Sequence, residues 1–170
     1  MTTSIDPDET MHTLSIFVAN KPGVLARIAQ VFARRGYNID SLVVSPSKEG
    51  EFSRMTIAAQ GSADGLEQIL FQLGKLVDII RCIDHSDDSA VVREMALIKI
   101  GTNVNERTEA LQIAEHFGCK TVDLTETSMI VMVTGVSEKV DACMTMMQKF
   151  NIVELVRTGK VVMARGDTET

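Results

Sequence analysis

The sequence predicts an α+β protein built from two units with the same βαββαβ order. Three observations support this fold class. The order strand, helix, strand, strand, helix, strand occurs twice along the 170 residues. Equivalent helices are expected to end at Gly36 and Gly118 and to begin at Ser62 and Ser137. The polar, acidic segment 84–89 separates the two halves and is expected to be a linker.

The first strand and the first helix follow from their hydrophobic periods. Apolar and polar residues alternate over residues 13–18, which predicts a strand. After the turn residues 20–23 a helical period begins, with Pro22 suited to the first helical turn and Gly36 to the position just past the last. The expected apolar stripe of this helix comprises Val24, Leu25, Ile28, Val31 and Phe32.

Three strands and one helix complete the first half. Residues 39–45 and 54–59 are expected to be strands that a hairpin loop at residues 46–50 joins. A helix that the Ser62 side chain caps should follow, and residues 77–83 should form the fourth strand. The expected apolar stripe of the second helix comprises Leu66, Ile69, Leu70 and Leu73.

The second half repeats this order. We expect the side chains of Asn105 and Ser137 to cap its two helices, the first of which ends at Gly118. Its strands are expected over residues 95–100, 121–124, 129–133 and 152–156, with another near 161–164.

The predicted architecture implies association. A βαββαβ unit folds as a four-stranded antiparallel sheet with two helices on one face, which leaves the other face bare. Such units usually hide the bare face or extend the sheet edge by pairing with another copy. We therefore expect at least a homodimer.

Composition narrows the function classes. Hydrophobic residues make up 45% and charged residues 24% of the chain, as in a soluble globular protein. The net charge of −6 argues against a nucleic-acid partner. The first ten residues are polar and acidic, and no stretch approaches the ~18 apolar residues of a membrane span. We expect no membrane partner and a cytoplasmic protein, with the matrix of an organelle as the alternative if a transit peptide has been removed.

No constellation of catalytic residues is apparent. The cysteines are widely spaced and contain no CxxC pair, which argues against a zinc knuckle or a dithiol redox site and favours free buried thiols. Each histidine stands alone in the sequence, without a carboxylate or cysteine at metal-ligand spacing. Binding is therefore favoured over catalysis. The residues concerned are Cys82, Cys119, Cys143, His12, His85 and His116.

The loop at residues 20–25 is the best candidate for a binding site. Gly23 allows a tight turn and close approach of a ligand to the backbone. The following helix N-terminus suits a carboxylate, and Asn20 offers both a donor and an acceptor. From these residues alone, a second interpretation stays open, in which Asn20 only fastens the turn and Gly23 only fits it.

Several motifs resemble a known family. Residues 20–28, which follow an apolar strand, resemble the opening of an ACT domain. Residues 35–42 resemble the RGYNIDSL-type signature of the small subunits of acetohydroxyacid synthase (acetolactate synthase). Further segments resemble later motifs of that family in the same order, so the resemblance covers residues 11–167. Those segments are 53–57, 72–78, 93–100, 157–159 and 164–167.

The resemblance implies a fold and a domain division. It implies two ferredoxin-like βαββαβ units, an N-terminal ACT domain plus a C-terminal α/β sandwich domain. The ACT domain would span residues 11–84 and would bind an amino-acid effector and dimerise. Residues 85–92 would be a linker, and residues 93–167 the C-terminal domain.

The resemblance also implies a role without catalysis. Such regulatory small subunits serve valine, isoleucine and leucine biosynthesis. They activate a catalytic large subunit that depends on thiamine diphosphate (ThDP), and they confer feedback inhibition by a branched-chain amino acid, most often valine. No cofactor is expected in this subunit, because ThDP, Mg and FAD belong to the catalytic partner.

The effector residues follow from matching the motifs. Asn20, Lys21, Pro22, Gly23, Val24 and Leu25 would come from one protomer, and Asn38 and Ile39 from the other. Leu25 and Ile39 would contact a branched side chain, although both also suit an ordinary core.

Three other functions stay open at this point. The chain could be a stand-alone ACT-type amino-acid sensor, a transcription regulator or a small enzyme. The regulator would need a DNA-binding helix-turn-helix or a basic arm, and the sequence supplies neither.

Overall fold

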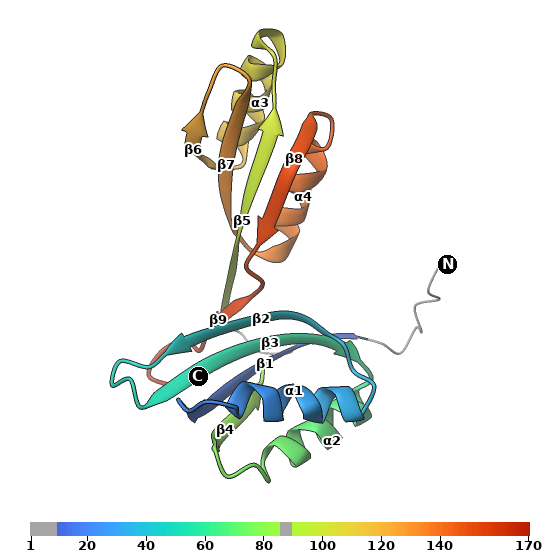
Figure 1. Cartoon of the computed structure of the whole chain (residues 1–170), viewed down its shortest axis with the longest axis vertical. Coiled ribbons are helices and arrows are strands. Elements are labelled where there is room, and N and C mark those ends of the chain that lie inside the picture. Colours follow the sequence, from blue (N-terminus) through green and yellow to red (C-terminus); the bar gives the residue numbers. More distant parts are fainter. Residues whose placement is uncertain (1–9, 86–89) are drawn as a thin grey trace. The chain divides into compact units, whose positions relative to one another are not determined.

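The computed structural model describes residues 10–85 and 90–170. The chain divides into two compact units. Unit 1 combines the described part of Met1–Val91 with Gly159–Thr170, and unit 2 is Val92–Thr158. Figure 1 shows that each unit is a sheet with two helices on one face.

Unit 1 has the expected βαββαβ order. Its strands form an antiparallel sheet in the order β2-β3-β1-β4, with both helices on the same side (Figure 1). This confirms the predicted fold of the first half. The elements are β1 (Thr10–Ala19), α1 (Val24–Arg34), β2 (Ile39–Pro46), β3 (Phe52–Gly61), α2 (Ala63–Leu73) and β4 (Ile79–Asp84).

The core of unit 1 lies between the sheet and its helices. Alternate residues of the central strands point to the helices and are buried, because side chains of a strand alternate between its faces. Each helix contributes one buried stripe. The core residues are Leu14, Ile16, Val18, Val24, Ile28, Phe32, Met55, Ile57, Ala59, Leu66, Ile69 and Leu73.

Some local expectations for unit 1 are wrong. Pro22 precedes α1 rather than lying in its first turn, because Gly23 is the N-cap. Leu25 is 39% exposed, so it does not belong to the buried stripe. Val77 is fully exposed ahead of β4, which begins at Ile79. The Ser62 cap is confirmed, since its Oγ accepts a hydrogen bond from the Gly65 amide at 3.3 Å.

Unit 2 repeats the architecture. Its four strands lie antiparallel in the order β6-β7-β5-β8, and its core lies between this sheet and two helices. The second predicted βαββαβ unit is thus confirmed. The elements are β5 (Val91–Gly101), α3 (Val104–His116), β6 (Lys120–Leu124), β7 (Ser128–Gly135), α4 (Ser137–Met147) and β8 (Asn151–Arg157).

Both predicted helix caps of unit 2 are wrong. Asn103, not Asn105, caps α3: its Oδ1 accepts from the Asn105 and Glu106 amides at 3.0 Å each. The Glu106 carboxylate accepts in turn from the Asn103 amide at 3.2 Å, which completes a capping box. Helix α4 begins at Ser137 itself, after Val136, and has no side-chain cap.

The end of the chain packs with unit 1. The sequence assigned residues 93–167 to the second domain, whereas Gly159–Thr170, which contains β9 (Val161–Met163), groups with the first unit. The Arg81 guanidinium donates to the Thr170 carbonyl at 2.8 Å and pairs with Glu169 at 3.2 Å. This segment therefore partly covers the sheet face that carries no helices.

Candidate functional site

The loop between β1 and α1 is fastened to a neighbouring turn. The Asn20 amide donates to the Glu51 carbonyl at 2.8 Å, and the Asn20 side-chain Nδ2 donates to the Gly50 carbonyl at 3.0 Å. The turn-fastening role of Asn20 is therefore real. It uses the donor end of the side-chain amide, which orients the exposed loop in front of α1.

Gly23 sets the start of α1. Its φ of 83° lies in the left-handed region that side chains disfavour, and its carbonyl accepts the first helical hydrogen bond, from the Arg27 amide at 3.1 Å. An added Cβ would meet only Arg27 Nη1, at 3.5 Å. The positive φ therefore requires glycine at this position, whereas there is space for a larger side chain.

The N-terminus of α1 has no side-chain cap and no acidic side chain beside it in its first turn. Helix N-termini carry unpaired N–H groups and a partial positive charge. Among the helices in residues 10–85 and 90–170, only α1 has neither a side-chain cap nor an acidic residue in its first turn. The first turns of the others contain Asp64, Glu106 and Glu138, respectively. The N-terminus of α1 can therefore accept an external carboxylate.

The charges around this loop are mixed, since the neighbouring turn also contains the exposed Glu49 and Glu51. Arg27 of the first turn forms an ion pair with Asp78, which neutralises that carboxylate. The Asp78 backbone carbonyl accepts from the Ala19 amide at 2.8 Å, which anchors that pair beside the loop. Lys21 is exposed and adds a positive charge.

Two neighbouring side chains of α1 point in different directions. Val24 is 3% exposed and belongs to the core, and its amide donates to the Lys21 carbonyl at 3.4 Å. Leu25 is exposed, which settles the open question about its core role. An apolar side chain thus lies at the surface next to the open helix N-terminus, as an amino-acid ligand with a branched side chain would need.

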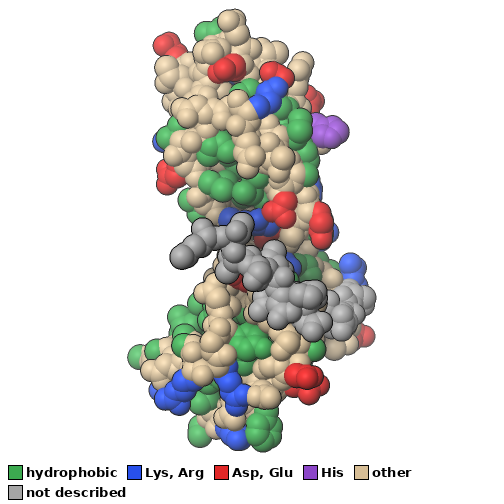
Figure 2. Space-filling view, turned by 90° about the vertical axis from the view of Figure 1, so that its right-hand side faces the viewer, with side chains coloured by type: hydrophobic (Ala, Val, Ile, Leu, Met, Phe, Trp, Pro, Cys, Tyr) green, Lys and Arg blue, Asp and Glu red, His purple; other side chains and the backbone are tan. Residues whose placement is uncertain are grey.

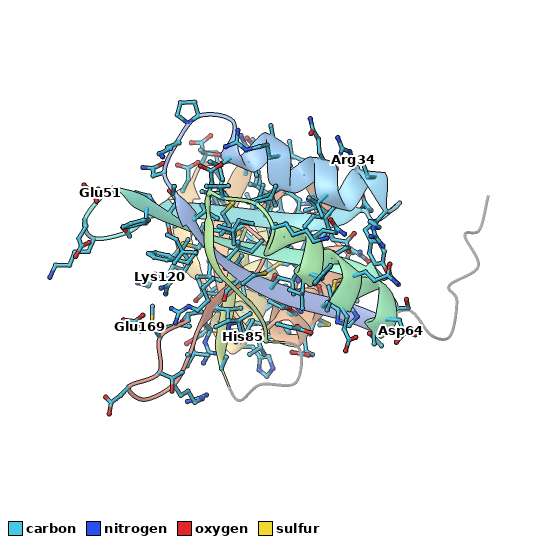
Figure 3. All side chains as sticks on the ribbon, turned by 90° about the horizontal axis from the view of Figure 1, so that it is seen from below. Arg34, Glu51, Asp64, His85, Lys120 and Glu169 are labelled. Atoms are coloured by element: carbon cyan, nitrogen blue, oxygen red, sulfur yellow. The ribbon has the colours of Figure 1, made fainter. Side chains whose placement is uncertain are left out.

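The second predicted group lies at the other end of α1. Asn38 is exposed and its Nδ2 donates to Asp40 Oδ1 at 3.2 Å. Ile39 is half-buried and packs against the core of unit 1. In Figure 3, Arg34 in the last turn of α1 and Glu51 beside the Asn20 loop lie far apart on the ribbon.

Tyr37 positions this second group, a role that the sequence analysis missed. Its ring lies against two glycines: a Cβ on Gly61 would fall 1.8 Å from Tyr37 Cε1, and one on Gly65 would fall 1.5 Å from its Oη. The hydroxyl also lies 3.4 Å from Ser62 Oγ. A glycine in the first turn of α2 was the available signal, because glycine is a poor helix former.

One chain does not bring both groups together. Helix α1 has 11 residues, which corresponds to a length of about 16 Å at about 1.5 Å per residue. The structure therefore unites Asn20, Lys21, Pro22, Gly23 and the exposed Leu25 at one end, and holds Asn38 and Ile39 at the other. A ligand of amino-acid size can touch both groups only if a second chain supplies one of them.

Two of the three histidines, His12 and His85, are locally hydrogen-bonded, which agrees with the expectation of histidines without a catalytic or metal-binding constellation. Pairing of β1 with β4 places His12 Nδ1 3.8 Å from Asp84 Oδ2. His85 Nε2 is hydrogen-bonded to Ser15 Oγ at 2.8 Å. Both imidazoles are buried, at 6% and 4% exposure, so they are locally hydrogen-bonded structural groups.

Two further observations concern metal binding and membrane-spanning helices. Within residues 10–85 and 90–170, no three histidine, cysteine or acidic residues are grouped as metal ligands would be. No helix in the described part of the chain is both long and apolar enough to span a membrane. Figure 2 shows apolar and charged side chains mixed over the visible surface.

Comparisons with known proteins agree with this architecture. Residues 14–81 match the model of the AHAS small subunit-like ACT domain, and residues 93–166 match the model of the small subunit of acetolactate synthase. The probable acetolactate synthase small subunit of Archaeoglobus fulgidus is 42% identical over 92% of this chain and 98% of its own length. The acetolactate synthase small subunit of Mycolicibacterium smegmatis is 39% identical over 91% of both chains.

A solved structure extends the likeness to three dimensions. The crystal structure of the acetolactate synthase small subunit from Thermotoga maritima matches with a TM-score of 0.84 and 36% identity, over 94% of this chain and 99% of the other. Sequence and fold thus agree over nearly the whole length of both proteins. The chain belongs to the acetolactate synthase small-subunit family.

Proposed function

We propose that this chain is the regulatory small subunit of a cytoplasmic acetolactate synthase in valine, isoleucine and leucine biosynthesis. It activates the ThDP-dependent catalytic subunit and confers feedback inhibition by a branched-chain amino acid, with valine the first candidate. The observation that carries this proposal is the open N-terminus of α1 behind Gly23, in a chain of this family.

The effector fits the loop by its three chemical parts. Its carboxylate accepts hydrogen bonds from the free N–H groups at the start of α1, where the helix dipole is favourable. Its ammonium group is held by the acceptor end of the Asn20 side chain, whose donor end is bonded to Gly50. Its branched side chain contacts the exposed Leu25.

A homodimer completes the site. Strand β2 is an edge of the sheet in unit 1, and an edge strand presents unpaired backbone groups that a second copy can pair with. A two-fold axis beside β2 runs the two α1 helices in opposite directions. The α1 N-terminus of one protomer then lies near Asn38 and Ile39 of its partner, and two equivalent sites form.

Regulation follows because two protomers together form the effector site. An effector that bridges two chains favours the arrangement of protomers to which it binds more tightly, and its leverage equals that difference in affinity. In this proposal the catalytic large subunit is a separate chain that contains the ThDP, Mg and FAD. The small subunit contains no cofactor and acts only by changing the activity of the catalytic subunit.

The experiment is a reconstitution with the catalytic subunit from the same organism. Acetolactate formation from pyruvate is measured for the catalytic subunit alone, with the small subunit, and with added valine, isoleucine or leucine. Activation by the wild-type chain and inhibition by one of these amino acids are expected. Asn20→Ala should keep the activation and lose most of the inhibition.

A matched control tests the specificity of that loss. Asn105 is an exposed asparagine in α3 of unit 2, and Asn105→Ala should leave both activation and inhibition unchanged. Inhibition of Asn20→Ala at wild-type valine concentrations would refute the effector site. Failure of the wild-type chain to associate with the catalytic subunit, together with saturable valine binding, would instead identify a stand-alone sensor.

A further inference from the structure

The fold of unit 2 brings together two cysteines that the sequence separates. Cys119 lies in the turn between α3 and β6, and Cys143 lies within α4. Their Sγ atoms are 3.6 Å apart. All three cysteines are free, as the sequence predicted. The spacing of the cysteines along the chain, on which that prediction was based, gave no sign of this proximity.

The two sulfur atoms are in direct non-bonded contact. The S–S bond length is about 2 Å, so the sulfur atoms must approach by only about 1.5 Å from their 3.6 Å separation. Small side-chain rotations can supply this approach. The Cys119 backbone is held at the end of α3 by a hydrogen bond from its amide to the Ala114 carbonyl at 2.8 Å.

The two thiols differ in exposure and in acidity. Cys143 is fully buried, whereas Cys119 is half-buried and therefore nearer to a small reagent in solvent. A hydrogen bond from the Cys143 thiol lowers the pKa of Cys119, and the Lys139 ammonium lowers it further, against an opposing effect of burial. The same hydrogen bond, together with burial, raises the pKa of Cys143.

These properties give each cysteine a distinct role. The thiolate is the nucleophilic form of cysteine, so Cys119 is the thiol that reacts first. Cys143 lies adjacent, as a resolving thiol does, and it gives up its proton only when it attacks the oxidised Cys119. The third cysteine, Cys82 in β4 of unit 1, lacks these features, because burial and then the Asp84 carboxylate raise its pKa to about 12.

We propose that Cys119 and Cys143 are a peroxide-sensitive pair that closes into a reversible intramolecular disulfide. In the first step the Cys119 thiolate attacks one oxygen of hydrogen peroxide, the O–O bond breaks, and a sulfenic acid and hydroxide form. In the second step the Cys143 sulfur attacks the Cys119 sulfenic sulfur. The S–S bond forms and water leaves, with the Cys143 proton transferred to the departing hydroxyl. An external dithiol reverses the oxidation.

The disulfide would link the start of the edge strand β6 to helix α4. It would thereby fix the turn after α3 against the other helix of unit 2. This inference concerns residues outside the effector loop and does not rest on the proposed function.

The test is peptide mapping of the full chain after mild oxidation. Reduced protein is treated with hydrogen peroxide, its free thiols are alkylated under denaturing conditions, and peptides are identified by mass spectrometry. The expected products are alkylated Cys82 and a cross-linked peptide pair that contains Cys119 and Cys143. Dithiothreitol should restore alkylation at Cys119 and Cys143, so that all three free cysteines are alkylated.

Variants separate the two steps. Cys119→Ser should abolish the cross-link, and Cys82→Ser, the matched control, should leave it intact. Cys143→Ala should leave a Cys119 sulfenic acid that dimedone traps. The wild-type map decides the matter even if a variant fails to fold: full alkylation of Cys119 and Cys143 at peroxide doses that oxidise Cys82 overturns the proposal. Cross-links between chains through Cys119 alone also overturn it.

Discussion

Replacement of Gly23 by alanine probes the effector site most sharply. Gly23 has a φ of 83°, and the added Cβ would have only ordinary contact, 3.5 Å from Arg27 Nη1. The substitution thus penalises the left-handed conformation without a steric clash, by ~1–2 kcal/mol. If the loop relaxes, the amides at the start of α1 turn away from the ligand, and loss of one hydrogen bond to a charged group costs ~1.5–3 kcal/mol.

The expected result is a fall in valine affinity of roughly tenfold or more, since ~1.4 kcal/mol corresponds to a factor of ten. Calorimetric titration of the purified chain measures the affinity, and thermal unfolding measures the stability. The matched control is Gly166→Ala, because Gly166 has a φ of 67° and open space around it. Both variants should lose similar stability, and only Gly23→Ala should lose affinity. Equal valine affinity in both variants would refute the reasoning.

Three further predictions concern the stability of the two units and the pH dependence of the free energy of unfolding. Gly65→Ala should destabilise unit 1 by ~1–3 kcal/mol through a clash with Tyr37, and unchanged thermal unfolding would contradict that packing. Asn103→Ala should destabilise unit 2 by ~1 kcal/mol through loss of the α3 cap, whereas Asn105→Ala should show no such loss in a denaturant titration. Burial raises the pKa of the Cys82 thiol from 9.0 to about 12. The folded state therefore disfavours the Cys82 thiolate, so the free energy of unfolding should decrease between about pH 9 and about pH 12. An equal decrease in the Cys82→Ala variant would show that another group is responsible.

The core and element order were predictable from the sequence because they depend on local periodicity. Alternation at Leu14, Ile16 and Val18 identified β1, and these side chains are fully buried. Gly36 was placed correctly past α1, where its φ is 73°, because a positive φ nearly always requires glycine. Such signals lie within one element and do not depend on the rest of the fold.

The errors have a common origin in competition between neighbouring residues. Asn103 lies just before α3 and Asn105 lies within its first turn, and Asn103, which has a glutamate three positions later, forms the capping box. Leu25 fitted an apolar stripe by spacing, yet it lies at the exposed edge of that stripe. Local periodicity gives the direction of a helix face only to within about one residue.

Contacts between distant residues were beyond sequence reasoning. Tyr37 lies against Gly61 and Gly65, and Cys119 lies beside Cys143, only because the strands and helices pair as they do. The effector loop was found because a glycine, an asparagine and a helix start are contiguous in sequence. Its second half was reached only through resemblance to a family, since Asn38 lies at the far end of α1.

The central claim is that the effector site is shared between two chains, and mixed dimers test it most directly. Gly23→Ala disables one half of the site and Asn38→Ala the other, so a homodimer of either variant has no intact site. A dimer with one chain of each variant has one intact site if the halves come from different protomers.

The measurement is the number of valines bound per dimer, by calorimetry on dimers purified through two different tags. The account predicts that the mixed dimer binds half as many valines as the wild type with wild-type affinity, while each variant homodimer binds weakly. A mixed dimer that binds as weakly as the two homodimers would place the site within one chain and contradict the account.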